Sequence, residues 1–164
     1  MVEMTIYGVS FDLVGKQPIV LLKTADGNKF LPIWIGHPEA AAILMKLQGA
    51  NTPRPMTHDL ISDVLGELDV ECTKVSVTEL RENTFYASIT LQLNGREMEI
   101  DSRPSDALAL AVRTGVSLGV LYSARIGDFH LVLAAASRAF AADRTYSERD
   151  VNDVLRGWLA QEGS

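Results

Sequence analysis

Hydrophobic and polar residues along the chain follow the two periods that are typical of strands and of helices. Strand-like segments occur at residues 5–13, 18–23, 30–35, 74–80, 85–93, 96–101 and 117–122. Helical spacing of apolar residues occurs at 38–48, 57–69, 104–114, 134–142 and 147–161. This order of elements predicts an α+β fold, with mixed or antiparallel sheets around buried helices.

A succession of three strands and one helix occurs twice. Each of the two helices is alanine-rich and opens with a proline, Pro38 or Pro104, at a position where no helical hydrogen bond is lost. A glycine, Gly49 or Gly115, follows eleven residues later in both cases and suits the end of a helix. We therefore predict an internal duplication of a β-β-β-α unit, with copies at about 5–49 and 74–115.

Glycine-containing dipeptides mark a hairpin in each copy. Asp26-Gly27 and Asn94-Gly95 stand between predicted strands. Both suit the tight type I′ turn, in which the two central residues have positive φ. Each copy is therefore expected to contain a hairpin whose second strand leads into the helix.

Two of the predicted helices differ in their apolar pattern. The helix at 38–48 is apolar almost all round, which is the pattern of a buried helix. The helix at 57–69 joins the two copies and has Thr57 as its predicted N-cap. Its apolar residues form one stripe at helical spacing, namely Leu60, Ile61, Val64, Leu65 and Leu68.

The last part of the chain reads as an appendage to the duplicated domain. We predict one domain at 1–133 and a helical C-terminal extension at 134–164. Within 147–161, Val151, Leu155 and Trp158 share one helical face. This face either docks on its own domain or forms a partner-binding or dimer helix.

Composition narrows the class of protein. With 164 residues the chain is expected to form one domain with an appendage. Its formal net charge of −6 argues against a broad nucleic-acid-binding face, because sequence-independent DNA binders are usually basic. Cys72 is the only cysteine and is expected to be a structural thiol. No secretory leader or membrane-length apolar run is present, so we expect a cytoplasmic protein without a membrane partner.

Four polar residues crowd the junction where the last strand of the second copy meets its helix: Asp101, Arg103, Ser105 and Asp106. In a functional interpretation, the two carboxylates bind a divalent cation and Arg103 contacts a phosphate oxygen. In a structural interpretation, Asp106 interacts with the positive end of the helix and Arg103 pairs with Asp101.

Two further polar groups stand at other helix starts. Arg54, Thr57, His58 and Asp59 lie at the start of the connecting helix. A histidine beside an aspartate can be a metal ligand or a general base, and it can equally be part of a solvated first turn. His37 and Glu39 open the first copy's helix. The duplication makes them pseudo-symmetric partners of the junction, and whether the two helix starts face one cleft stays open.

Four segments resemble the bifunctional nuclease family in sequence, order and spacing. They read LPIWIG at 31–36, RPMTHDL at 54–60, NTFYA at 83–87 and IDSRPSDALALAVRTG at 100–115. The resemblance covers roughly residues 1–133. It implies a compact α+β domain and activity on both DNA and RNA.

The resemblance turns the polar residues of these segments into candidates for a nuclease site. We predict a metal-dependent phosphodiesterase that uses Mg²⁺ or Mn²⁺. The predicted metal ligands are Asp59, Asp101 and Asp106. The predicted catalytic residues are His58, Asp101, Arg103 and Asp106, and the predicted contacts to nucleic acid are Arg54, Arg103 and Ser105. The alternative is a non-catalytic binding or regulatory module that acts as a homo-oligomer, expected to be a dimer.

Overall fold

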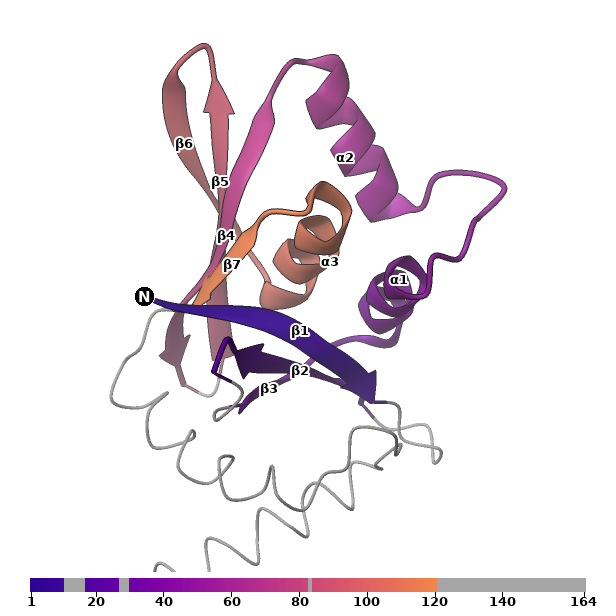
Figure 1. Cartoon of the computed structure of the whole chain (residues 1–164), viewed down its shortest axis with the longest axis vertical. Helices are drawn as coiled ribbons and strands as arrows, with labels where there is room; N and C mark the ends of the chain where they lie inside the picture. The colour runs from indigo at the N-terminus through magenta and orange to yellow at the C-terminus, as the bar shows by residue number, and fades with distance from the viewer. Residues whose placement is uncertain (11–16, 27–29, 83, 121–164) are drawn as a thin grey trace, which may run out of the picture.

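The protein is an α+β structure with one mixed sheet, as the sequence predicts (Figure 1). The computed structural model describes residues 1–10, 17–26, 30–82 and 84–120. Within these ranges the chain forms a seven-stranded sheet and three helices. None of the described helices is both long enough and apolar enough to cross a membrane.

Two antiparallel meanders make up most of the sheet. The first consists of β1 (Val2–Ser10), β2 (Ile19–Thr24) and β3 (Phe30–Trp34). The second consists of β4 (Glu71–Arg81), β5 (Thr84–Leu93) and β6 (Arg96–Ser102). The short strand β7 (Ser117–Val120) joins them, because it pairs antiparallel with β1 and parallel with β4. The order across the sheet is therefore β3-β2-β1-β7-β4-β5-β6.

Each meander is followed by a helix. The helix α1 (His37–Leu47) comes after β3, and α3 (Pro104–Thr114) comes after β6. The helix α2 (Thr57–Glu67) connects the two halves. The element order β-β-β-α is thus present in both halves, while a common origin of the two units stays a prediction.

Local signals in the second half behave as predicted. Asn94 and Gly95 both have positive φ, at 50° and 77°, as a type I′ turn requires. Pro104 is the first residue of α3, and Gly115 ends it in the left-handed conformation, with φ 71°. The corresponding turn of the first half includes residues 27–29, which lie outside the described part of the chain.

The core lies between the sheet and α3, and α3 occupies the centre of the helical layer (Figure 1). Four consecutive residues of α3, from Ala107 to Leu110, are at most 2% exposed. The prediction that α1 is buried all round is wrong in part. Ala40, Ala42 and Ile43 are buried, but Leu47 is exposed. The reason is that only one face of α1 packs, against α3 and β1.

The apolar stripe of α2 is mostly exposed. Leu65 packs against the core. The other four residues of the stripe are between 41% and 61% exposed, namely Leu60, Ile61, Val64 and Leu68. We call these four residues the α2 surface. The helix attaches to the rest of the protein by its opposite side, which carries the buried His58.

Two remaining predictions concern Cys72 and the C-terminal segment. Cys72 on β4 is buried, as expected of a structural thiol, and burial raises the pKa of the thiol. The predicted helices at 134–142 and 147–161 lie outside the described residues, as does the predicted domain boundary at 133.

Candidate functional site

The start of α3 carries the polar junction found in the sequence. Arg103 is extended, with φ −67° and ψ 144°, and forms the N-cap position ahead of Pro104. Among the described residues, no side chain caps the start of α3 by a hydrogen bond. The backbone N–H groups of that turn and the positive end of the helix dipole therefore face the space in front of the helix.

Arg103 is held by two carboxylates from different helices. Its Nε donates to Asp106 Oδ2 at 2.7 Å, and its Nη2 donates to Asp106 Oδ1 at 3.0 Å and to Glu39 Oε1 at 3.0 Å. The suggested pairing of Arg103 with Asp101 is not observed. Hydrogen bonds to Asp106 and Glu39 raise the pKa of Arg103, so the guanidinium is permanently charged. Its side chain is nevertheless 66% exposed.

His58 extends this arrangement into the protein. Its Nε2 lies 3.0 Å from Asp106 Oδ1, and its side chain is buried between α2 and α3. Burial raises the pKa of Asp106, but the hydrogen bonds from Arg103 and His58 outweigh it, and the pKa is lowered overall. Asp106 is therefore ionised at neutral pH. We call Glu39, Arg103, Asp106 and His58 the Arg103 cluster.

The contact between Glu39 and Arg103 shows that the starts of α1 and α3 do face each other. Gly36, just before α1, makes room for this contact, because a Cβ atom there would collide with the carboxylate of Glu39. His37 is exposed. Of the pair predicted at the first helix start, only Glu39 thus joins the cluster.

Asp59 stabilises the start of α2 by accepting hydrogen bonds. Its Oδ2 accepts a hydrogen bond from the backbone N–H of Met56 at 2.9 Å, and its Oδ1 accepts one from Arg113 Nε at 2.6 Å. The N-cap is therefore Met56, and the prediction of Thr57 is wrong by one residue. The bond from Met56 lowers the pKa of Asp59, burial opposes this, and Arg113 adds to the lowering.

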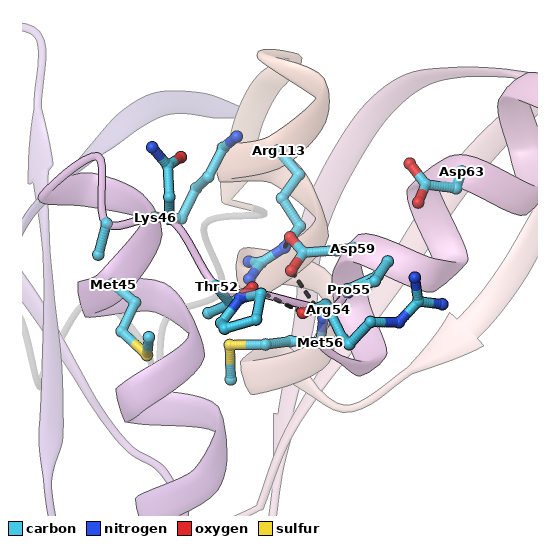
Figure 2. Close-up of a pocket in the computed structure, with 12 residues that line it drawn as sticks. Met45, Lys46, Thr52, Arg54, Pro55, Met56, Asp59, Asp63 and Arg113 are labelled. Carbon is cyan, nitrogen blue, oxygen red and sulfur yellow. Dashed lines mark hydrogen bonds and ion pairs between the residues drawn. The ribbon is translucent and has the colours of Figure 1, made fainter.

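A cavity of about 270 Å³ lies beside this pair, between the end of α1 and the start of α2 (Figure 2). The exposed Arg54 and Lys46 line it together with Asp59 and Arg113. The hydroxyl of Thr52 donates to the carbonyl of Arg54 at 2.7 Å and shapes the loop. The predicted nucleic-acid contact Arg54 is thus separate from Arg103.

A larger cavity, of about 640 Å³, opens in front of α3. Arg103 and Ser105 line it, as do Trp34 at the end of β3 and Phe85 at the start of β5. We call it the Trp34 pocket. Sequence reasoning did not select either aromatic residue, although both lie in the segments that resemble the nuclease family. Aromatic residues at strand ends next to a polar helix start are the signal that could have identified them.

The three carboxylates predicted as metal ligands do not come together. Asp101 pairs with Ser88 in the β5–β6 ladder, while the neighbouring Ile89 packs on the core, so Asp101 projects from the face opposite α3. Both oxygens of Asp106 and both oxygens of Asp59 already accept hydrogen bonds. Across the ranges that the structure describes, no three His, Cys, Asp or Glu side chains are arranged to hold a metal ion. These residues therefore do not fit one shared cation site.

Comparisons with known proteins agree with the motifs. The family model described as bifunctional nuclease domain matches residues 20–124. An uncharacterized protein of Mycobacterium tuberculosis strain H37Rv is 42% identical over 118 residues, which are 72% of this chain and 70% of that protein. Bifunctional nuclease 1 of Oryza sativa subsp. japonica is 28% identical over 105 residues, or 62% of this chain, and Bifunctional nuclease 1 of Arabidopsis thaliana is 26% identical over 108 residues, or 63% of it. The match covers only 32% and 33% of these plant proteins. The chain therefore belongs to the bifunctional nuclease domain family.

Proposed function

We propose that the protein is a nuclease that cleaves phosphodiester bonds in DNA and RNA at the Trp34 pocket. Membership of the family supports a relationship to nucleases. The observation that carries the proposal is the position of Arg103. This exposed cation is fixed by two carboxylates beside a cavity that also receives the uncapped start of α3. Helix starts and arginine side chains both bind phosphate groups well, the first through backbone N–H groups and the second through charge-assisted hydrogen bonds.

In this proposal Arg103 binds a phosphate oxygen of the substrate. Its Nε and Nη2 are engaged by Asp106 and Glu39, whereas Nη1 has no hydrogen-bond partner among the described residues. The guanidinium is therefore oriented by the protein while one of its NH₂ groups stays available. Such preorganisation favours binding, because little side-chain freedom remains to be lost.

Asp106 and His58 line neither of the two cavities. We therefore assign them to positioning: Asp106 holds Arg103, and His58 holds Asp106. This assignment differs from a direct proton-transfer role for His58. It predicts that a substitution of His58 lowers the cleavage rate because Arg103 is held less firmly. The pH profile of the reaction should stay the same.

No step of the proposal is assigned to a metal ion, because the predicted ligands do not share a site. Dependence on Mg²⁺ or Mn²⁺ stays a prediction. In proteins Mg²⁺ is commonly held by one or two carboxylates together with oxygen atoms of the substrate phosphate. The test is cleavage with and without EDTA, followed by addition of each cation, with single-stranded DNA and RNA as substrates.

The proposal is tested by the variant Arg103→Gln in a cleavage assay. Loss of a charge-assisted hydrogen bond of about 1.5–3 kcal/mol is expected to lower the rate by about 10- to 150-fold. The matched control is Arg96→Gln, at an exposed position on β6 away from the cavity. Full cleavage by Arg103→Gln, or absence of any cleavage by the purified protein, would overturn the proposal. Thermal melts verify that both variants fold.

The α2 surface favours a second candidate function. Four exposed apolar residues on one helix face are typical of a protein–protein contact. A non-catalytic module that acts as a homo-oligomer, with a second copy covering this surface, accounts for the exposure. The mass of the protein in solution and its change in an α2 variant distinguish this candidate from a monomeric nuclease.

A further inference from the structure

We infer that the Trp34 pocket receives an unpaired nucleobase together with its attached phosphate. The preferred substrate is then a single strand or a frayed end rather than an intact duplex. The inference rests on the proposed function, because it names the substrate class of the same site. Three observations on the pocket and one on the charge of the chain carry it.

The first observation is the apolar wall of the pocket. The residues that line the pocket include two aromatic ones, Trp34 and Phe85, and three aliphatic ones, Ile33, Ile35 and Leu80. Planar bases stack on aromatic residues, and such stacking is tolerant of sequence because every base has a π-face. A volume of about 640 Å³ is in the range of small-molecule sites.

The second observation is an unsatisfied polar group at one end of the pocket. Ser105 is only 7% exposed, and its hydroxyl has no hydrogen-bond partner in the part of the chain that the structure describes. A buried hydroxyl without a partner is unfavourable, and such groups are rare in folded proteins. A phosphate oxygen in the pocket would accept a hydrogen bond from this hydroxyl.

The third observation is that two further anion-binding features lie at the same end. The first turn of α3 has no side-chain cap, and Ser105 belongs to that turn. Arg103 lines the same cavity with its Nη1 group unengaged by the described residues. The pocket therefore has an apolar aromatic wall and a cationic polar end, which matches the division of a nucleotide into base and phosphate.

The fourth observation is the overall charge. Duplex binding without sequence preference requires basic residues that neutralise many phosphates along the backbone. The formal net charge of this chain is −6. Insertion of one base with its phosphate needs only a local cation, and stacking supplies the remaining affinity. The charge therefore disfavours duplex binding and leaves single-strand binding possible.

The two tryptophans of the chain allow a direct test. Trp34 and Trp158 are the only tryptophans of the chain, so Trp158→Phe leaves Trp34 as the single tryptophan reporter. This variant is titrated with a single-stranded phosphorothioate oligonucleotide, with a blunt hairpin of the same sequence, with a mononucleotide and with inorganic phosphate. We expect the single strand to quench Trp34 and to bind at least about 10-fold more tightly than the hairpin. Phosphate alone should not quench.

Variants of the pocket complete the test. Removal of a stacking ring weakens binding by about 5- to 150-fold, so Phe85→Ala should weaken single-strand binding by that factor. Tyr86→Ala is the matched control, since Tyr86 follows directly on β5, is exposed and does not line the pocket. Because Phe85 also packs against the core, Ser105→Ala is the second variant, and it should weaken binding of the oligonucleotide without a change in fold.

The outcomes separate this inference from the proposed function. Equal affinity for single strand and hairpin, or binding without quenching of Trp34, overturns the inference even if the protein cleaves nucleic acid. A mononucleotide that binds as tightly as the oligonucleotide overturns the assignment to a strand and indicates a free nucleotide. Quenching with single-strand preference in a protein that never cleaves supports the inference and overturns the proposed catalysis.

Discussion

At the scale of single residues, the buried cation Arg113 links all three helices of the described fold. Its side chain is 3% exposed. It donates to Asp59 on α2, to the carbonyl of Ala42 on α1 and to the carbonyl of Ala109 within α3. Every polar contact of this side chain is therefore internal, and its role is to hold α2 in place rather than to bind a ligand.

Replacement of Arg113 by methionine should destabilise the protein strongly. The variant leaves the partly buried carboxylate of Asp59 without its cation, and breaking such a pair costs about 3–5 kcal/mol. Urea unfolding of the variant measures the free energy of unfolding directly. Arg96→Met, at an exposed position, serves as the control and should change it by less than about 0.5 kcal/mol. A loss below about 1 kcal/mol for Arg113→Met would contradict the proposed linking role.

The two aspartates of the junction should behave differently in a cleavage assay. Asp106→Asn loosens Arg103, so we expect cleavage to fall by about 10-fold or more. Asp101 projects from the opposite face of the sheet, so we expect Asp101→Asn to cleave within about two-fold of the unmodified protein. A loss of activity in Asp101→Asn that raised Mg²⁺ or Mn²⁺ restores would return Asp101 to the site as a metal ligand.

At the scale of elements, α2 is attached by two polar residues and one apolar residue, and it exposes the rest of its apolar stripe. His58, Asp59 and Leu65 make its contacts with the rest of the fold. We expect Val64→Lys to change the free energy of unfolding of the monomer by less than about 0.5 kcal/mol, because Val64 is exposed. If a second copy covers the α2 surface, the same variant should convert the oligomer to monomer in light-scattering measurements.

Leu108→Ala provides the contrast for that experiment. Leu108 is fully buried on α3, so its truncation should cost about 2–5 kcal/mol. The contrary result is that Val64→Lys lowers the free energy of unfolding by a similar amount in a protein that is always monomeric. That result would show that α2 packs on its own chain, and it would remove the support for the second candidate function.

The sequence predicted those elements whose signals are local. Pro104, the Asn94-Gly95 turn and Gly115 each specify backbone geometry through their own residue type. The contact between Arg103 and Glu39 could not be predicted, because it joins residues 64 positions apart and depends on how α1 and α3 pack. The outward direction of the α2 stripe escaped prediction for a related reason, since periodicity shows that a face is apolar but not what covers it.

At the scale of the whole molecule, two ion-paired carboxyl groups connect α2 to α3 and make the fold sensitive to acid. The backbone N–H of Met56 and then Arg113 lower the pKa of Asp59, and Arg103 with His58 lowers the pKa of Asp106. Both values lie below the ordinary 3.8 of an aspartate. In the folded state the two carboxyl groups therefore stay ionised at a pH at which the same groups already bind protons in the unfolded chain. This stabilisation is complete above the ordinary pKa and is lost as the pH falls through the lowered values.

Urea unfolding between neutral pH and about pH 3 should reveal this dependence. The free energy of unfolding should be nearly constant down to about pH 5 and should then fall. The double variant Asp59→Asn/Asp106→Asn should have a lower free energy of unfolding at neutral pH, and this free energy should fall less steeply as the pH is lowered. Parallel curves for the two proteins would show that other groups cause the acid sensitivity.

The central position of β7 has a consequence for the order of events during synthesis. β7 lies in the middle of the sheet, yet it is the last of the described strands to be translated. Until Ser117–Val120 leave the ribosome, β1 and β4 each present an open edge, and unpaired edges of this kind recruit other chains. A ribosome that pauses shortly before this segment would therefore hold two half-sheets that depend on chaperones, and a chain ended there should aggregate rather than fold with reduced activity.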